Sequence, residues 1–252
     1  MIPLRDSIPS RTTPFVNYAV IAICTLAFFV QFTSQDKGGL IIEQYGMVPA
    51  RLTDPDAQPV IEQKVLVQTN RGVQQQVVRH ELAPAAITPW MTLVACMFLH
   101  GGVMHFAGNM WFLYVFGDNV EDRLGHFGFL LVYLGTGVAA SMAHYAAGPN
   151  SPIPTIGASG AIAGVMGAYA WLYPQSKVQA ILPIPIFLRT FVLPAPVFLG
   201  IWFAMQTYNG ITSTSAGVAW WAHIGGFVAG AIIALLVGRS PVGRNAVVQR
   251  RF

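Results

Sequence analysis

The chain has 252 residues, of which 54% are hydrophobic and only 10% are charged. Soluble globular domains carry roughly 25% charged residues, so this composition excludes an ordinary soluble domain and favours a polytopic membrane protein. The net charge of +4 does not indicate nucleic-acid binding, because the basic residues lie at the chain ends and beside apolar segments. Cys24 and Cys96 both lie in apolar stretches and are predicted to be inert thiols.

Six long uncharged runs follow one another along the chain. Each supplies the roughly 20 apolar residues that a helix needs to cross a bilayer. Helices are expected because a backbone in lipid must satisfy its own hydrogen bonds. We therefore predict an all-α polytopic membrane protein, a single domain over residues 1–252 with a six-span core at 14–238. The runs are Phe15–Gln35, Trp90–Gly117, Phe127–Thr155, Ile156–Ser176, Phe191–Gly217 and Val218–Gly238.

The positive-inside rule predicts the orientation of these runs. Arg5 and Arg11 precede the first run, and a tail at 239–252 carries four further arginines, so both termini are expected in the cytoplasm. Lys177 and Arg189 fall in the fourth loop, which is then also inward. The first run lacks a small-residue cleavage site and is expected to be retained. Because no organelle-targeting segment is evident, the plasma (inner) membrane of a bacterium is the predicted location.

The segment at 36–89 is expected to form a long first loop on the outer, extracytoplasmic side. Within it, Val60–Val78 alternates valine and glutamine around Asn70-Arg71-Gly72, which predicts a small β-hairpin. This hairpin is too small to be a second domain with its own core. No internal repeat is evident, which disfavours a transporter built on duplicated halves.

Four polar residues are expected at similar depth near the outer face. In the six-span topology the second, fourth and sixth spans all run from outside to inside. His105, Asn109, Ser159 and His223 lie near the starts of these spans. A polar side chain inside lipid is unfavourable unless it has a partner or a task, so their convergence predicts a functional site.

Ser159 and His223 are residue types that can act as nucleophile and general base. Small residues let helices approach closely in lipid, and Gly226-x-x-x-Gly230 on the sixth run is predicted to pack against the glycines of the fourth. That contact would bring the Ser159 hydroxyl within hydrogen-bond reach of His223. Because no acidic residue lies at this depth, a Ser/His dyad is predicted in place of a Ser-His-Asp triad.

The oxyanion of an acyl-transfer intermediate needs hydrogen-bond donors. His105 and Asn109 are spaced i, i+4 and therefore share one helix face. The backbone N–H of Ser159 is the expected third donor, because first-turn amides lack intrahelical acceptors. Gly157 and Gly160 would let a substrate carbonyl approach this turn closely.

Other intramembrane protease chemistries lack their residues. The chain has no His-Glu-x-x-His motif for zinc and no pair of aspartates in separate spans. No metal or organic cofactor is expected. His100 is assigned a supporting role in loop structure, and Trp90, at the start of the second run, is a second supporting candidate.

These residues resemble those of the rhomboid family of intramembrane serine proteases, of the basic six-span bacterial type. The resemblance extends from Pro14 to Gly238. Its motifs are His100-x4-His105-x3-Asn109, Glu121-x-Arg123-x-Gly125, Gly157-Ala158-Ser159-Gly160 and Ala222-His223-Ile224-Gly225-Gly226.

The resemblance implies a rhomboid-like six-helix bundle in which Ser159 is the nucleophile and His223 the base. It assigns His105 and Asn109 to the oxyanion site and makes a span at Phe191–Thr207 the gate that admits substrate. The implied partners are the lipid bilayer and single-span membrane proteins, cleaved where their helices unwind near the outer face. The Glu121 and Arg123 side chains are predicted to be structural.

Two positions depart from the family pattern. Met91 follows Trp90 where many members have arginine, and Ala163 stands where some have an aromatic ring against which the histidine stacks. Packing against Trp220 or Trp221 is expected to replace that contact. Two alternative functions are a catalytically silent rhomboid-like protein that binds transmembrane helices, and a transporter that uses the polar cavity. The sequence indicates neither a natural substrate nor an oligomeric state.

Overall fold

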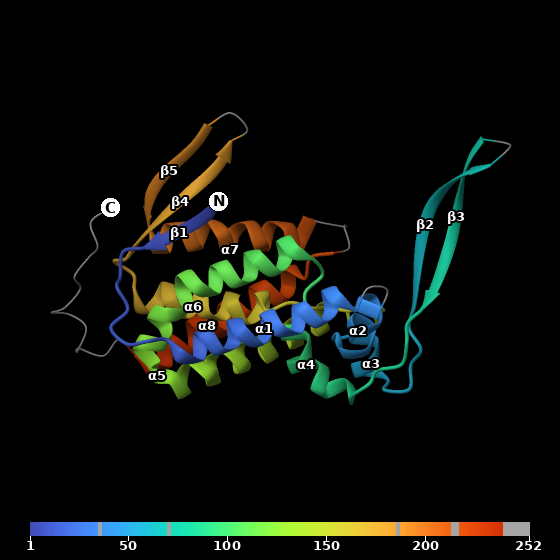
Figure 1. The fold of residues 1–252 in the computed structure, drawn as a ribbon, viewed down its shortest axis with the longest axis horizontal. Coiled ribbons are helices and arrows are strands. Elements are labelled where there is room, and N and C mark those ends of the chain that lie inside the picture. Colours follow the sequence, from blue (N-terminus) through green and yellow to red (C-terminus); the bar gives the residue numbers. More distant parts are fainter. Residues whose placement is uncertain (35–36, 70–71, 185–186, 213–216, 239–252) are drawn as a thin grey trace.

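The computed structural model describes residues 1–34, 37–69, 72–184, 187–212 and 217–238; the predicted tail at 239–252 lies outside them. Long helices run side by side in one bundle, with β-strands projecting at both of its ends (Figure 1). The helices are α1 (Phe15–Thr33), α2 (Lys37–Tyr45), α3 (Pro49–Thr53), α4 (Thr92–Ala95), α5 (Val103–Ala147), α6 (Ser159–Leu172), α7 (Ala195–Thr212) and α8 (Trp220–Val237). The strands are β1 (Ile2–Asp6), β2 (Val60–Thr69), β3 (Gly72–Glu81), β4 (Lys177–Ile184) and β5 (Phe187–Pro194).

Among the described residues, α1, α5 and α8 are long and apolar enough to cross a membrane, and α6 is a shorter apolar helix of 14 residues. The chain is thus a helical membrane protein. The helix α5 is two limbs joined at Gly125, whose φ of 72° and ψ of 166° are non-helical. In Figure 1 its ribbon runs along the bundle, reverses, and returns. Since a side chain would be strained at this positive φ, glycine lets the chain turn back without a loop.

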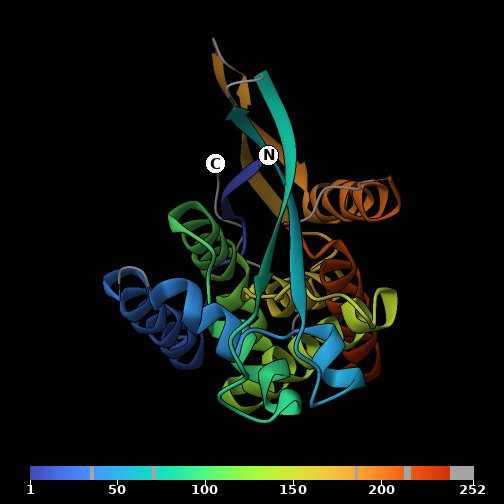
Figure 2. The same cartoon turned by 90° about the vertical axis from the view of Figure 1, so that its right-hand side faces the viewer.

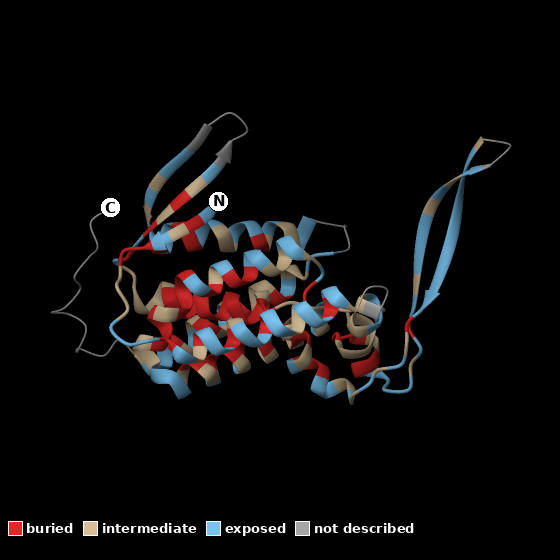
Figure 3. Ribbon diagram, viewed as in Figure 1, coloured by how far each residue is buried: buried red, intermediate tan, exposed pale blue. Residues whose placement is uncertain are grey.

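Helix α6 lies at the centre of the bundle, where buried residues concentrate (Figure 3). Every residue from Gly160 to Tyr169 is buried. A Cβ added to Gly226 would lie 2.0 Å from the carbonyl oxygen of Gly160, and one on Gly230 would lie 1.8 Å from that of Gly164. The backbones of α6 and α8 are therefore in direct contact, as the glycine spacing predicts.

The carboxylate of Glu121 ties the start of α1 to the reversal in α5. It is fully buried and accepts the backbone N–H groups of Val16 at 2.9 Å and Asn17 at 2.6 Å, together with a 2.5 Å contact to Nδ1 of His126. First-turn amides need such an acceptor. Arg123 instead donates to the carbonyl of Gly238 at 3.4 Å, so these two motif residues serve separate structural contacts.

A three-stranded antiparallel sheet, in the order β1-β4-β5, covers the same end of the bundle. The fourth loop predicted around Lys177 and Arg189 is present between α6 and α7, but it forms the paired strands β4 and β5, which the sequence does not predict. Asp6, at the end of β1, holds the sheet to the bundle because its Oδ2 accepts from Tyr169 at 2.6 Å and from Asn119 at 2.9 Å.

The single helix predicted at Trp90–Gly117 is interrupted at residues 99–102, which are not helical. The part before the break, Pro89–Phe98, is a short apolar helix made of α4 between two 3₁₀ turns, and the next helix begins only at Val103. The side chain of Gln31 satisfies the backbone of His100, whose N–H donates to Oε1 at 3.0 Å and whose carbonyl accepts from Nε2 at 3.3 Å. Non-helical backbone is tolerated here because it is buried in protein and bonded to a side chain.

The hairpin expected in the first loop is confirmed. Strands β2 and β3 pair antiparallel from Val60↔Glu81 to Thr69↔Gly72, with the turn residues 70–71 outside the described part of the chain. The hairpin projects well beyond the helices, and Figure 2 shows it rising on the same side of the bundle as β4 and β5.

Candidate active site

The side chains of Ser159 and His223 meet at the end of the bundle that carries the first loop. Ser159 is the first residue of α6, and His223 lies in the first turn of α8. The Ser159 Oγ and His223 Nε2 atoms are 2.8 Å apart, a hydrogen-bond distance. The contact of Gly160 with Gly226, one residue after the serine and three after the histidine, places them this close.

Gln206 on α7 orients the histidine, a role not predicted from the sequence. Its Oε1 lies 2.8 Å from His223 Nδ1, and its Nε2 donates to the carbonyl of Trp202 at 3.4 Å. Because that bond directs Oε1 toward the imidazole, Nδ1 must carry the proton and donate. Nε2 is then unprotonated, and its lone pair accepts a hydrogen bond from the Ser159 hydroxyl, as a general base requires.

Two tryptophans pack against the imidazole ring of His223. They replace the aromatic ring that some family members have at the position of Ala163. Trp220, one of the two residues predicted to pack against the histidine, meets His223 edge to face with ring centroids 6.1 Å apart. Trp202 on α7 lies 5.9 Å away at an interplanar angle of 38°. Trp221, the other residue expected there, is 40% exposed. Ring contacts from two helices therefore fix the histidine.

His105 and Asn109 converge on Gly157, two residues before the serine. A Cβ added to Gly157 would lie 2.7 Å from His105 Nε2 and 3.6 Å from Asn109 Nδ2, and the φ of this residue is +120°. The positive φ and the closeness of the His105 ring thus both favour glycine here. The backbone N–H of Gly101 donates to His105 Nδ1 at 3.3 Å, which leaves Nε2 protonated and able to donate.

The amide of Asn109 is a buried donor that finds no acceptor in the described part of the chain. Asn109 is 8% exposed, and its Nδ2 has no hydrogen-bond partner among the described residues. Such a group is unusual, because buried polar atoms are nearly always bonded. The Ser159 N–H, at the first position of α6, adds another donor without an intrahelical acceptor. The donors of His105 and Asn109 therefore lie beside Gly157, and the third is the backbone N–H of Ser159 itself, two residues later.

A cavity of about 20 Å³ adjoins the serine. It is large enough for one water molecule or a very small side chain. Its lining includes Gly157, Ser159, Gly160, Ala219 and Ala222.

The two supporting residues lie in different places. His100 is buried behind His105, with ring centroids 5.4 Å apart, so it backs the donor side of the site. Trp90 lies in the 3₁₀ turn at Pro89–Met91 and is 55% exposed.

The comparisons with known proteins agree in naming one family. Residues 88–240 match the rhomboid domain family. Over 177 residues the chain is 30% identical to Rhomboid-like protein 11, chloroplastic, of Arabidopsis thaliana, which covers 68% of this chain and 59% of the relative. It is 32% identical over 158 residues to the rhomboid protease GluP of Bacillus subtilis, covering 61% and 27%. It is 26% identical over 163 residues to Rhomboid protein 1, mitochondrial, of Saccharomyces cerevisiae, covering 61% and 44%.

The chain therefore belongs to the rhomboid family of membrane proteins. The aligned part spans 59%, 27% and 44% of these three relatives, so their remaining segments have no counterpart in the alignments.

Proposed function

We propose that this protein is an intramembrane serine endopeptidase that hydrolyses peptide bonds in or beside the transmembrane segments of other membrane proteins. The 2.8 Å contact between Ser159 and His223 carries this proposal, because it joins a hydroxyl to an imidazole whose other nitrogen is held by Gln206. This is the arrangement of an activated nucleophile: a base within reach, oriented by a third group.

The catalytic steps follow from the His223 tautomer that carries its proton on Nδ1. His223 Nε2 takes the Ser159 proton as Oγ attacks the scissile carbonyl carbon, and later returns it to the leaving amine. Asn109 Nδ2, His105 Nε2–H and the Ser159 N–H are positioned to donate to the oxygen as it becomes negative. A water molecule, deprotonated by the same histidine, then hydrolyses the acyl-enzyme and restores the serine.

The proposed membrane arrangement has six crossings: α1, the two limbs of α5 at 103–124 and 126–147, α6, α7 and α8. Arginines near both ends of the chain support cytoplasmic termini. The dyad then lies toward the outer face, below the first loop. A bacterial plasma membrane stays a prediction from the sequence.

The substrate class follows from the same geometry. A helical backbone keeps its carbonyl in an intrahelical hydrogen bond, so the cleaved segment must unwind before Ser159 reaches it. The cavity of about 20 Å³ beside the serine favours a very small side chain at that point. Single-span membrane proteins with small residues near the outer end of the span are therefore the proposed substrates.

The test uses purified protein in liposomes with a fluorogenic transmembrane-segment substrate, and compares the wild type with Ser159→Ala and His223→Ala. Cleavage by the wild type that is lost in both variants would support the dyad. Substrate binding without turnover by any of the three would instead favour a silent helix-binding protein. Flux of a solute that Ser159→Ala leaves unchanged would favour a transporter.

A further inference from the structure

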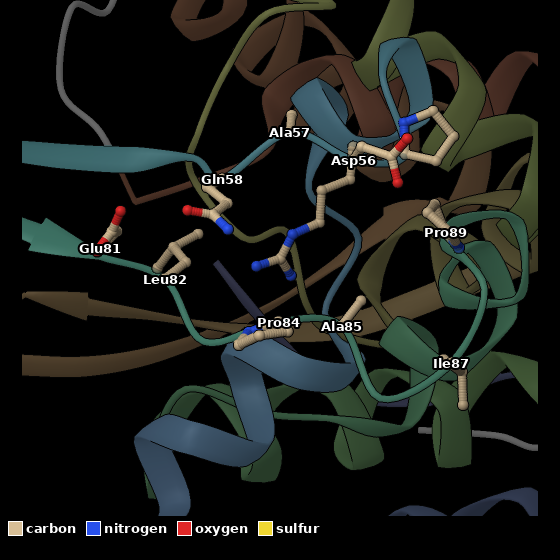
Figure 4. Close-up of a pocket in the computed structure, with 11 residues that line it drawn as sticks. Asp56, Ala57, Gln58, Glu81, Leu82, Pro84, Ala85, Ile87 and Pro89 are labelled. Atoms are coloured by element: carbon tan, nitrogen blue, oxygen red, sulfur yellow. The ribbon is translucent and has the colours of Figure 1, made fainter.

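A second, larger cavity lies at the base of the β2–β3 hairpin. Its volume is about 490 Å³, within the size range of sites that hold small molecules or peptide side chains. In Figure 4, Ala57 and Gln58 lie on one side of the hollow and Pro84 and Ala85 on the other. The cavity shares no lining residue with the small cavity beside Ser159.

The cavity contains a buried positive charge. Arg51, on α3, is 4% exposed and lines the cavity. Its Nη1 donates to the carbonyl of Glu43 at 2.6 Å, and its Nη2 donates to the carbonyl of Ala83. A guanidinium has five N–H donors, so these two bonds leave others free for a ligand. In the part of the chain that the structure describes, no carboxylate lies within ion-pair distance of it, although the charge of Glu43 acts on it from farther away.

The rest of the lining is apolar, apart from Gln58 and two exposed acids, Asp56 and Glu81. Figure 4 shows these two acids well separated across the view. A purely anionic ligand would meet both carboxylates, and a purely cationic one would meet the buried guanidinium. A polypeptide backbone offers acceptors to Arg51 and Gln58 and donors to the acids, and the apolar walls suit its side chains. We propose that this cavity binds an extended segment of a polypeptide.

Hydrogen bonds connect the cavity to the segment that carries the serine. Ala50, next to Arg51, donates its N–H to the carbonyl of Ser151 at 3.1 Å. Met47 and Thr155 exchange backbone hydrogen bonds of 3.0 and 2.8 Å, two residues before Gly157. The segment that carries Arg51 is thus hydrogen-bonded to the segment that leads to Ser159. On the proposed function, on which this step rests, the occupant is the extramembrane segment of the substrate.

The test measures substrate binding to the Ser159→Ala protein in liposomes, so that it does not depend on turnover. One probe is a labelled transmembrane segment with an outer extension of about 15 residues, which spans roughly 50 Å when extended. The other is the same segment without the extension. Ala57→Trp and Ala85→Trp fill the cavity from opposite sides, and Gln75→Trp on the exposed face of the hairpin is the matched control.

The extension is expected to lower the Kd about tenfold, equivalent to about 1.4 kcal/mol. Both cavity variants should remove this gain and bind the short probe normally, whereas the control should keep it. An extension that adds no affinity would overturn the proposal. Cavity variants that keep the gain, or that bind both probes more weakly by the same factor, would also overturn it. So would cavity variants that change only binding to anionic-lipid vesicles, because the occupant would then be a lipid headgroup. A wild type that cleaves nothing while the gain persists would refute the protease and leave the cavity site standing.

Discussion

At the scale of single residues, the amide of Gln206 does for the histidine what a carboxylate does in a Ser-His-Asp triad, but without a charge. A neutral acceptor suits a site within a membrane, where an ionised side chain is unfavourable. It also stabilises the protonated imidazole less than a carboxylate would. A neutral glutamine is therefore a better partner for His223 in a membrane than an ionised carboxylate.

Gln206→Leu removes this acceptor and keeps the side-chain size. We expect kcat to fall about tenfold, since a hydrogen bond of this kind contributes about 1–1.5 kcal/mol. KM should change little, because Gln206 contacts the base and not the substrate. Met205→Leu, a neighbouring and exposed position on α7, is the control. A loss of equal size in that variant would show a general disturbance of α7.

Asn109→Ala separates a role in catalysis from a role in stability. Because Asn109 Nδ2 has no partner among the described residues, its removal breaks no hydrogen bond there, and the melting temperature should stay the same or rise. The rate should fall about 10²–10³-fold, as for other oxyanion donors. Parallel kinetic and thermal unfolding measurements check this. A large loss of stability with little loss of rate would instead make Asn109 a structural residue.

At the scale of elements, the direct contact of α6 with α8 sets the separation of the two reacting groups. Each helix carries one of them, and the glycines leave no space in which the helices could slide. A change in this contact therefore alters both stability and the dyad.

Gly230→Ala tests the contact, because its Cβ would lie 1.8 Å from the carbonyl oxygen of Gly164. Forcing an atom into a filled core costs about 1–3 kcal/mol, so the melting temperature and the activity should both fall. Gly200→Ala on α7 is the matched control, since its Cβ would have nothing within 4 Å. Equal melting temperatures for the two variants would contradict the close packing.

The first loop is expected to loosen in acid. Burial opposes the charge of Glu43, but hydrogen bonds from the Ala83 N–H and from His80, with the charges of His80 and Arg51, lower its pKa below the usual 4.5. A group with a lowered folded pKa adds stability above about pH 4.5 and loses it as the pH falls through the folded value. Hydrogen exchange at Ala83 should therefore accelerate in that window, and Glu43→Gln should abolish the pH dependence. Exchange at Ala83 that stays pH-independent in the wild type, after correction for intrinsic rates, would refute the predicted role of Glu43 in the first loop.

At the scale of the whole molecule, apolar patterning predicts the core helices because burial in lipid leaves few alternatives to a helix. It also predicts the hairpin at Val60–Val78 and the meeting of Ser159 with His223. It fails at residues 99–102, where the bonds from Gln31 to the backbone of His100 hold a non-helical break in the predicted helix. It also fails at β1-β4-β5: the pairing of β1 with β4 joins residues distant in the sequence, and the paired β4 and β5 lie in the predicted fourth loop. The sequence does contain a signal for Gln206, because an amide inside an apolar run needs a partner.

The reversal at Gly125 bears on how the chain is made. The limbs at 103–124 and 126–147 have no linker between them, and Glu121 and His126 contact each other across the turn. The polar residues at 118–123 lie within the first limb itself, so no separate loop follows that limb before the second begins. We therefore expect the two limbs to enter the bilayer together, as one hairpin. α1 would already be in place during biogenesis, with its first amides ready for the Glu121 carboxylate.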